Sequence, residues 1–134
     1  MNNVPRFTFE EWAATRCMHW EKQIKKAIRA GNIPIDFEYV VKLVIEKAAL
    51  LFDNGESFAI VEVNSYRGTH PFVHIFIAGG NFDRLHDLER DQVVPFAKQI
   101  GAKKMTLLGR LGFKERLPSY GWKQSAVFFE KEIV

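Results

Sequence analysis

One stretch, Phe72–Arg110, limits what this chain can fold into. An apolar run, Phe72–Ala78, leads into Gly79 and Gly80, a helical pattern follows, and a second apolar run covers Met105–Leu108. This order predicts two parallel neighbouring strands joined by a right-handed crossover through the helix. The glycine pair precedes the helix, where unpaired N–H groups bind anions and missing Cβ atoms let a ligand come close. We therefore take this turn as the first candidate for a functional site.

The length of the chain predicts one domain over residues 1–134, with a helical part over 1–56 and a sheet part over 57–134. The single cysteine, Cys17, excludes an intramolecular disulfide and favours a reducing, cytoplasmic setting. No apolar run approaches the roughly 18 residues of a membrane span. A net charge of +3 is weaker than nucleic-acid binders usually carry. We expect neither a membrane nor a nucleic acid as partner.

Two helices are expected in the helical part. Thr8 and Glu11 form a capping box that predicts a helix from Phe9 to Ala30. Asp36 is a second N-cap, for a helix from Phe37 to Phe52. Their apolar residues recur every three or four positions, so the helices should pack against each other and against one side of a sheet.

The rest of the chain predicts an α/β fold, a small mixed sheet flanked by helices. Ser57–Asn64 and Phe72–Ala78 are predicted to form an antiparallel hairpin. Pro95 lies inside the crossover helix and predicts a break or kink near Asp91–Val94. A final strand is expected over Ser125–Ile133.

Simple catalytic and metal motifs are missing from the sequence. The four histidines form no HExxH pattern and no pattern with paired cysteines, so we expect no metal site. Cys17 lies on a predicted helix without a histidine nearby in sequence, which favours a buried small side chain over a nucleophile.

The C-terminal part of the chain resembles the GCN5-related N-acetyltransferase superfamily, and in particular small acyltransferase-like proteins of tailed bacteriophages. The resemblance covers roughly residues 58–134. It is carried by the segments IFIAGGN, FAKQIGAKKMTLLGRLGF and LPSYGWKQSAVFFEKEI, with the glycine pair, the helix end Ala97–Gly101, the step Gly109-Arg110-x-Gly112-Phe113 and the closing apolar strand.

The resemblance implies a place for a cofactor. In the superfamily, the turn after the fourth strand holds the pyrophosphate of acetyl-coenzyme A, and the pantetheine arm lies where the fourth and fifth strands splay apart. Carried over, Phe72–Ala78 would be the fourth strand and Met105–Leu108 the fifth. The cofactor-binding residues would be Ile77, Gly79, Gly80, Asn81, Phe82 and Arg110.

Acyl transfer to an amine needs a base for the amine and a proton donor. Glu62 or His74 is the candidate base and Tyr120 the candidate acid. If the loop is symmetric about Gly68, Glu62 faces His74 across the hairpin, close enough for a hydrogen bond. Each residue also has a structural interpretation: a strand-edge carboxylate, a hydrogen-bonded core imidazole and a packing tyrosine.

Two functions remain open at this point. The first is an acyl-coenzyme A-dependent N-acyltransferase of a phage, acting on an amine acceptor in the host cytoplasm. The second is a protein that keeps the fold without the reaction and serves as a virion component or a binder of a phage or host protein. The second is favoured by a turn with only two adjacent glycines and by Leu117 at the position where the superfamily usually has its catalytic tyrosine.

Overall fold

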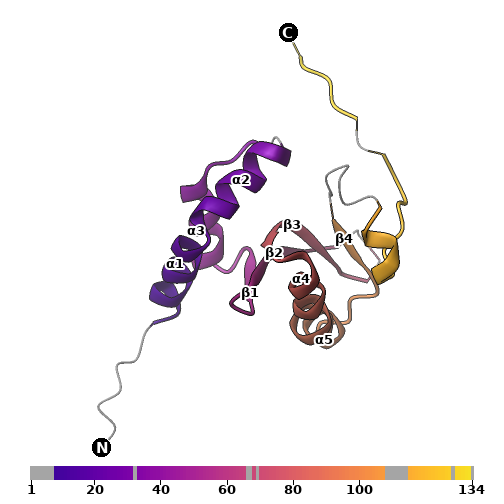
Figure 1. Ribbon diagram of the computed structural model, residues 1–134, viewed down its shortest axis with the longest axis horizontal. Coiled ribbons are helices and arrows are strands. Elements are labelled where there is room, and N and C mark those ends of the chain that lie inside the picture. The colour runs from indigo at the N-terminus through magenta and orange to yellow at the C-terminus, as the bar shows by residue number, and fades with distance from the viewer. Residues whose placement is uncertain are drawn as a thin grey trace, which may run out of the picture.

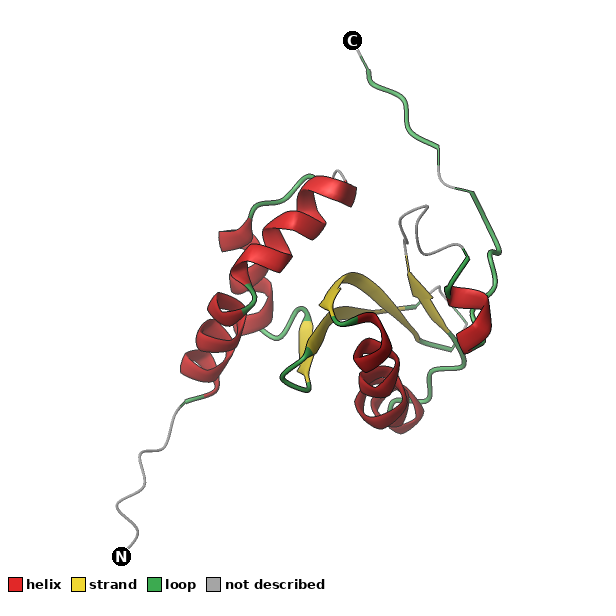
Figure 2. Ribbon diagram, viewed as in Figure 1, coloured by secondary structure: helices red, strands yellow, loops and turns green. Residues whose placement is uncertain are grey.

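A computed structural model describes residues 8–31, 33–65, 68, 70–107, 115–127 and 129–133. In this part of the chain, four strands form one mixed sheet with helices on both faces (Figure 1, Figure 2). The strand order is β1 (Leu50–Asp53), β2 (Ser57–Asn64), β3 (Phe72–Gly80) and β4 (Met105–Leu107). The helical elements are α1 (Phe9–His19), α2 (Glu21–Gly31), α3 (Phe37–Ile45), α4 (Phe82–Leu88), the π-helical segment η1 (Glu89–Val93), α5 (Val94–Gln99) and the 3-10 turn η3 (Leu117–Tyr120).

The N-terminal helix is interrupted once. The capping box of Thr8 and Glu11 is present, as predicted. The predicted continuous helix to Ala30 is wrong, because α1 ends at His19 and α2 begins at Glu21. Trp20 lies between them, and its indole N–H donates to the Asp53 carboxylate at 2.6 Å. This bond ties the junction of the two helices to the end of β1.

The second helix is shorter than predicted. It begins after the Asp36 cap, as expected, but ends at Ile45 instead of Phe52. Lys47 has a φ of 61°, a left-handed conformation that no α-helix continues through. The following apolar residues form β1, in which Leu51 pairs with Ile60 of β2. Pairing with the sheet therefore overrides the helical pattern of this segment.

The strand pairing follows the prediction. β2 and β3 are antiparallel, and β3 and β4 are parallel neighbours joined through the α4–α5 helical segment. Glu62 pairs with His74, the register expected from a loop symmetric about Gly68. A β-bulge shifts the register further along, where Phe76 is the extra residue of β3 between Ile75 and Ile77. A bulge increases the local twist and redirects the side chains beside it.

The crossover helix is irregular where Pro95 predicts. The chain passes from α4 through the π-helical turn of η1 into α5, and Pro95 lies at the start of α5. A proline is tolerated in a first helical turn because its missing N–H would have no partner there. The break predicted near Asp91–Val94 is present as this π-helical turn.

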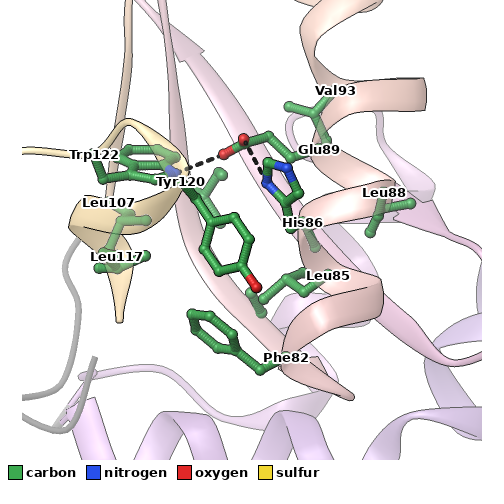
Figure 3. Close-up of a pocket in the computed structure, with 13 residues that line it drawn as sticks. Phe82, Leu85, His86, Leu88, Glu89, Val93, Leu107, Leu117, Tyr120 and Trp122 are labelled. Carbon is green, nitrogen blue, oxygen red and sulfur yellow. Dashed lines mark hydrogen bonds and ion pairs between the residues drawn. The ribbon is translucent and has the colours of Figure 1, made fainter. Parts of the chain in front are cut away.

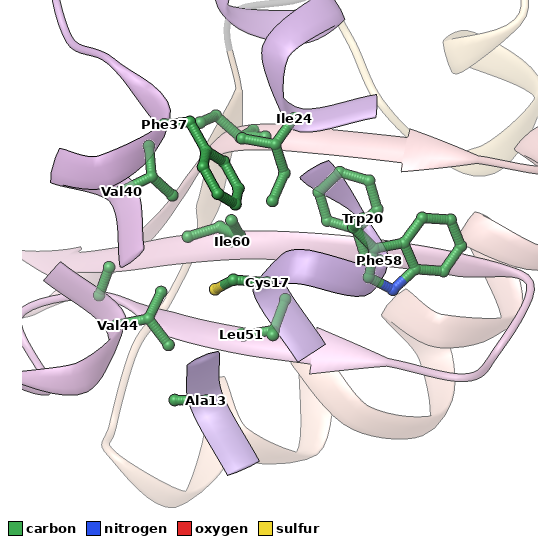
Figure 4. Packing of buried hydrophobic residues seen from close by; sticks show 12 residues of the cluster. Ala13, Cys17, Trp20, Ile24, Phe37, Val40, Val44, Leu51, Phe58 and Ile60 are labelled. Carbon is green, nitrogen blue, oxygen red and sulfur yellow. The ribbon is translucent and has the colours of Figure 1, made fainter. Parts of the chain in front are cut away.

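Two apolar cores lie on opposite faces of the sheet. Figure 4 shows the first, in which Cys17, Trp20 and Ile24 of the N-terminal helices meet Phe58 and Ile60 of β2. The second lies under α4, η1 and α5 and contains Ala59, Val61, Val73, Ile75, Leu88, Val93 and Ala97. Cys17 is fully buried, as predicted, and burial raises the pKa of its thiol to about 11.

The predicted last strand is not formed. The described residues from 123 onward have no regular secondary structure and lead away from the body of the molecule (Figure 1). Val127, Phe129 and Ile133 are 63%, 86% and 98% exposed. The alternating apolar pattern is that of a strand, but none of the described strands pairs with this segment.

Candidate functional site

A row of polar side chains crosses three neighbouring strands. Glu62 of β2 pairs with His74 of β3, which pairs with Thr106 of β4. Neighbouring residues of a strand point to opposite faces. Val61, Val73 and Ile75 point into the second core, so the polar row lies on the other face, the one that α1–α3 cover further along. The sequence analysis predicted the pair Glu62–His74 and missed Thr106.

His74 makes its hydrogen bond to Thr106. Its Nδ1 atom lies 2.8 Å from Thr106 Oγ1, where the sequence analysis expected a bond to the Glu62 carboxylate. Burial lowers the pKa of His74 below its usual value, and the nearby charge of Glu62 opposes this shift in part. The imidazole is therefore mainly neutral at pH 7, the state that accepts a proton.

The glycine pair is part of the sheet. Gly79 and Gly80 are the last two residues of β3 and pair with Phe58 and Ser57. A Cβ atom on Gly80 would lie 2.4 Å from the Glu56 carbonyl oxygen, and one on Gly79 would lie 2.9 Å from a ring carbon of Phe58. Gly80 also has a φ of 96°. Close strand packing accounts for both glycines without a ligand.

One amide of the predicted phosphate cradle has a partner within the chain. The Asn81 N–H donates to the Glu56 carbonyl oxygen at 2.9 Å, so it is not a free donor for a phosphate. The Asn81 side chain caps α4 by accepting from the Arg84 N–H at 3.1 Å. Ile77 is only 2% exposed and belongs to the first core. Arg110 lies outside the described residues.

Two arginines flank the start of α4. Arg84 pairs with Glu56 at 2.8 Å and with Asp87 at 2.5 Å. The Arg116 guanidinium lies 3.8 Å from the ring centroid of Phe82 and 3.5 Å from the Asp83 carboxylate. These arginines supply positive charge beside the helix start, although carboxylates already pair with both.

An apolar pocket lies between the sheet, α4 and the segment from Leu117 to Trp122 (Figure 3). Its cavity volume is about 60 Å³, and it opens to solvent on one side. Ile75 and Ala78 of β3 and Leu107 of β4 form its floor. The described pairing of β3 with β4 covers only Val73–Ile75, while β3 continues to Gly80. The pocket therefore lies near the carboxyl ends of the described parts of two parallel strands, a common ligand position in α/β sheets.

Polar groups on the pocket wall bond to one another. The Tyr120 hydroxyl donates to the Asp83 carboxylate at 2.8 Å, and its ring stacks on His86 with centroids 4.2 Å apart. The Trp122 indole N–H donates to Glu89 at 2.7 Å, and His86 Nδ1 lies 3.7 Å from the same carboxylate (Figure 3). Burial raises the pKa of Glu89, while the Trp122 bond and the His86 charge oppose the shift.

The predicted catalytic residues fall into two groups. Glu62 and His74 share one face of the sheet, whereas Tyr120 lines the pocket on the other face. The structure adds His86, Glu89 and Trp122 to the second group. The spacing of His86 and Glu89 places them one turn apart on a helix, a signal available in the sequence. Their contact with Trp122 depends on tertiary packing and has no sequence signal.

The described residues contain no group of three or more His, Cys, Asp or Glu side chains placed to hold a metal ion. None of the helices described combines the length and the apolar character that crossing a membrane requires.

A helix-flanked mixed sheet with this strand order is the fold of GCN5-related N-acetyltransferases, so the predicted fold class is confirmed. No family model and no curated protein matches the sequence. The chain is similar to a tetramutant of protein BH1408 from Bacillus halodurans, with a TM-score of 0.63, 11% identity, and coverage of 96% of this chain and 98% of that one.

Two structures named as acetyltransferases have the same fold. Ribosomal-protein-alanine N-acetyltransferase from Brucella melitensis biovar Abortus 2308 matches with a TM-score of 0.57 and 12% identity, over 90% of this chain and 93% of that one. Glucosamine-6-phosphate N-acetyltransferase from Arabidopsis thaliana matches with a TM-score of 0.52 and 12% identity, over 85% of this chain and 92% of that one.

Proposed function

We propose that this protein is an acyl-coenzyme A-dependent N-acyltransferase. The observation that carries the proposal is the position of the apolar pocket at the point where the described pairing of β3 and β4 ends. His74, held by Thr106, lies on the same pair of strands and faces the other side of the sheet. A thioester bound between these two strands would reach the pocket from one face and the imidazole from the other.

The residues present suit acetyl-coenzyme A in two respects. The apolar floor of Ile75, Ala78 and Leu107 suits the pantetheine arm and the acyl group. Arg84 and Arg116, at the start of α4, would attract the phosphates once their carboxylate partners are displaced. The coenzyme would supply the activated acyl group, and the amides of Gly79, Gly80 and Phe82 stay proposed phosphate contacts.

The proposed reaction joins the acyl carbon to an amine. The amine nitrogen attacks the thioester carbonyl carbon, the carbon–sulfur bond breaks, and the thiolate leaves. His74 takes the proton that the amine loses, with Glu62 stabilising the resulting charge. Tyr120 is the proposed donor to the thiolate, because its bond to Asp83 raises the pKa of the phenol and keeps it protonated.

Titration calorimetry with acetyl-coenzyme A tests the proposal. We expect saturable binding with a Kd in the micromolar range. Two further ligands are tested beside it: coenzyme A, which lacks the acetyl group, and adenosine 3′,5′-bisphosphate, which lacks the pantetheine arm. Their comparison separates pantetheine binding from phosphate binding alone. No heat of binding at millimolar acetyl-coenzyme A would overturn the proposed activity.

A second function is favoured by the strand packing of the glycine pair and by the engaged Asn81 amide. Under this alternative, the protein keeps the fold without the reaction and binds a phage or host protein, as a virion component or in the infected cell. The exposed apolar C-terminal residues supply a surface for such contacts. Absence of coenzyme binding together with capture in assembled phage particles would support it.

A further inference from the structure

A shallow groove follows the outer side of α2, beginning where α1 ends. Its lining consists of Met18, His19, Glu21, Lys22, Lys25 and Arg29. Ile24, on the opposite side of the same helix, is fully buried in the first core. The groove therefore faces away from that core, and a partner could reach it without disturbing the packing of α2.

Three cations lie along this groove. Lys22, Lys25 and Arg29 are spaced by three and four residues, which places them on one side of a helix, and all three are exposed. Lys25 pairs with Glu21 at 2.6 Å. Lys22 and Arg29 have no carboxylate partner in the part of the chain that the structure describes. The bond to Glu21 raises the pKa of Lys25, and the nearby charge of Arg29 opposes this rise, so these two cations are close enough to repel each other.

We propose that this groove binds a short acidic segment of another protein. Carboxylates of the partner would pair with Lys22 and Arg29 and relieve the repulsion between the cations. An apolar side chain beside them would cover Met18, which is 65% exposed at the end of α1. This inference goes beyond the proposed acyl transfer and does not depend on it, because it rests on the charge and shape of the groove.

The length of the charged row sets the size of the bound segment. At a rise of about 1.5 Å per residue, Lys22 and Arg29 lie about 10 Å apart along the helix axis. An extended chain covers about 10 Å with about three residues. Exposed ion pairs each contribute little and are screened by salt, so the complex should be weak and should depend on ionic strength.

The composition of the lining favours a protein partner over a nucleic acid. Grooves for single-stranded nucleic acid combine cations with aromatic side chains on which the bases stack. Among the described residues that line this groove there is no phenylalanine, tyrosine or tryptophan. The net charge of +3 is also weaker than nucleic-acid binders usually carry.

Fluorescence anisotropy with a model acidic peptide tests the groove. The probe is a short fluorescein-labelled peptide of glutamates around one leucine, and its matched control has glutamine in place of every glutamate. We expect the full-length protein to bind the glutamate peptide saturably at low ionic strength, less tightly as salt is added, and not to bind the glutamine peptide. Absence of saturable binding of the glutamate peptide at low ionic strength would overturn the proposal.

Charge reversal on α2 tests the location of the site. In Lys22→Glu/Arg29→Glu, each substitution removes an attraction and adds a repulsion, so the Kd of the glutamate peptide should rise about tenfold or more. Lys22→Gln/Arg29→Gln should give an intermediate Kd, because it removes the attraction alone. Lys98→Glu/Lys103→Glu is the matched control, since both lysines are exposed, lie outside the groove and change the net charge equally. Equal losses in the two reversed variants would refute the proposal, because the net charge would then account for the binding.

A single-stranded oligothymidylate with as many negative charges as the peptide separates the two classes of partner. We expect it to bind more weakly than the glutamate peptide, because the groove offers its bases no stacking surface. Tighter binding of the oligothymidylate, lost in Lys22→Glu/Arg29→Glu, would assign the groove to a nucleic acid and overturn the proposed partner.

Discussion

Gly80→Ala is predicted to destabilise the protein through one backbone contact. The new Cβ would lie 2.4 Å from the Glu56 carbonyl oxygen and 2.7 Å from the Ser57 Cα atom. Both atoms belong to the backbone, so no side chain can rotate to relieve the overlap. The same carbonyl accepts the Asn81 N–H that positions the start of α4. The substitution therefore strains the β2–β3 ladder and the beginning of the helix together.

The expected cost has two parts. A left-handed φ costs a non-glycine residue about 1–2 kcal/mol. Forcing an extra carbon into a packed site costs about 1–3 kcal/mol more. Gly55 separates these parts, because it has a φ of 88° but no atom within 4 Å of an added Cβ. Gly55→Ala should cost only the first part, so the two variants should differ by about 1–3 kcal/mol.

Urea unfolding followed by tryptophan fluorescence measures this difference. Trp20 stacks on Phe58 in the first core with centroids 4.9 Å apart, so its emission reports on the sheet that carries Gly80. Equal free energies of unfolding for the two variants would refute the steric argument. The result also bears on coenzyme binding: a bulky residue at Gly80 is expected to disturb the fold, so lost binding in Gly80→Val would not locate a phosphate site.

Two further substitutions probe buried carboxylates. Asp53→Asn should lower the free energy of unfolding at pH 7 by about 2 kcal/mol, because the carboxylate accepts bonds from Arg16, Trp20 and Gly55. Burial raises the pKa of Asp53, but these bonds outweigh burial and hold the pKa below its usual value. The stability that the bonds contribute is therefore present above about pH 4 and is lost as the pH falls further. Unfolding measured at pH 7 and pH 3 should show this loss in the unmodified protein and not in Asp53→Asn. Glu89→Gln should gain stability relative to the unmodified protein between pH 4 and pH 7, because burial raises the pKa of Glu89 and its ionisation opposes folding as the pH rises. Parallel pH dependences for Glu89→Gln and the unmodified protein would contradict this reasoning.

The crossover unit could be predicted from the sequence because its signals are local. Two apolar runs, a glycine pair and one long helical pattern are compatible with few topologies. The register of Glu62 against His74 followed from the symmetry of a single loop. The irregular helical turn before Pro95 followed from the chemistry of proline.

The predictions that were wrong or left open share one cause, because each depends on tertiary contacts that the sequence does not reveal. The apolar residues before Asp53 fit a helix as well as a strand, and only pairing with β2 decides between them. The predicted strand at the C-terminus has the right composition but no neighbour within the described chain. The glycine pair fits either a ligand or close packing, and the position of the Glu56 carbonyl oxygen cannot be read from sequence.

Only part of the candidate site could be predicted, because some of its contacts are local in the sequence and others depend on tertiary packing. Glu62 and His74 lie on a hairpin, so their pairing is a local property. Thr106 joins them only through the parallel register of β3 and β4, which depends on the length and path of the crossover. Tyr120 was chosen from its position beside Gly121, and its bond to Asp83 on the pocket side depends on how η3 packs against α4.

Acetyl transfer to a panel of primary amines, measured for His74→Gln beside His70→Gln, tests the central claim most directly. His74 is half-buried and bonded to Thr106, whereas His70 is an exposed histidine of the hairpin loop. His70→Gln is therefore the control, because it makes the same substitution away from the candidate base. The account predicts transfer by the unmodified protein that declines only at a pH below the usual imidazole pKa of about 6.5, because burial lowers the pKa of His74. It predicts a loss of about 10²–10⁴-fold for His74→Gln with acetyl-coenzyme A binding retained, and no change for His70→Gln. Transfer that His74→Gln leaves intact, or equal losses in both variants, would contradict the assignment of His74 as the base.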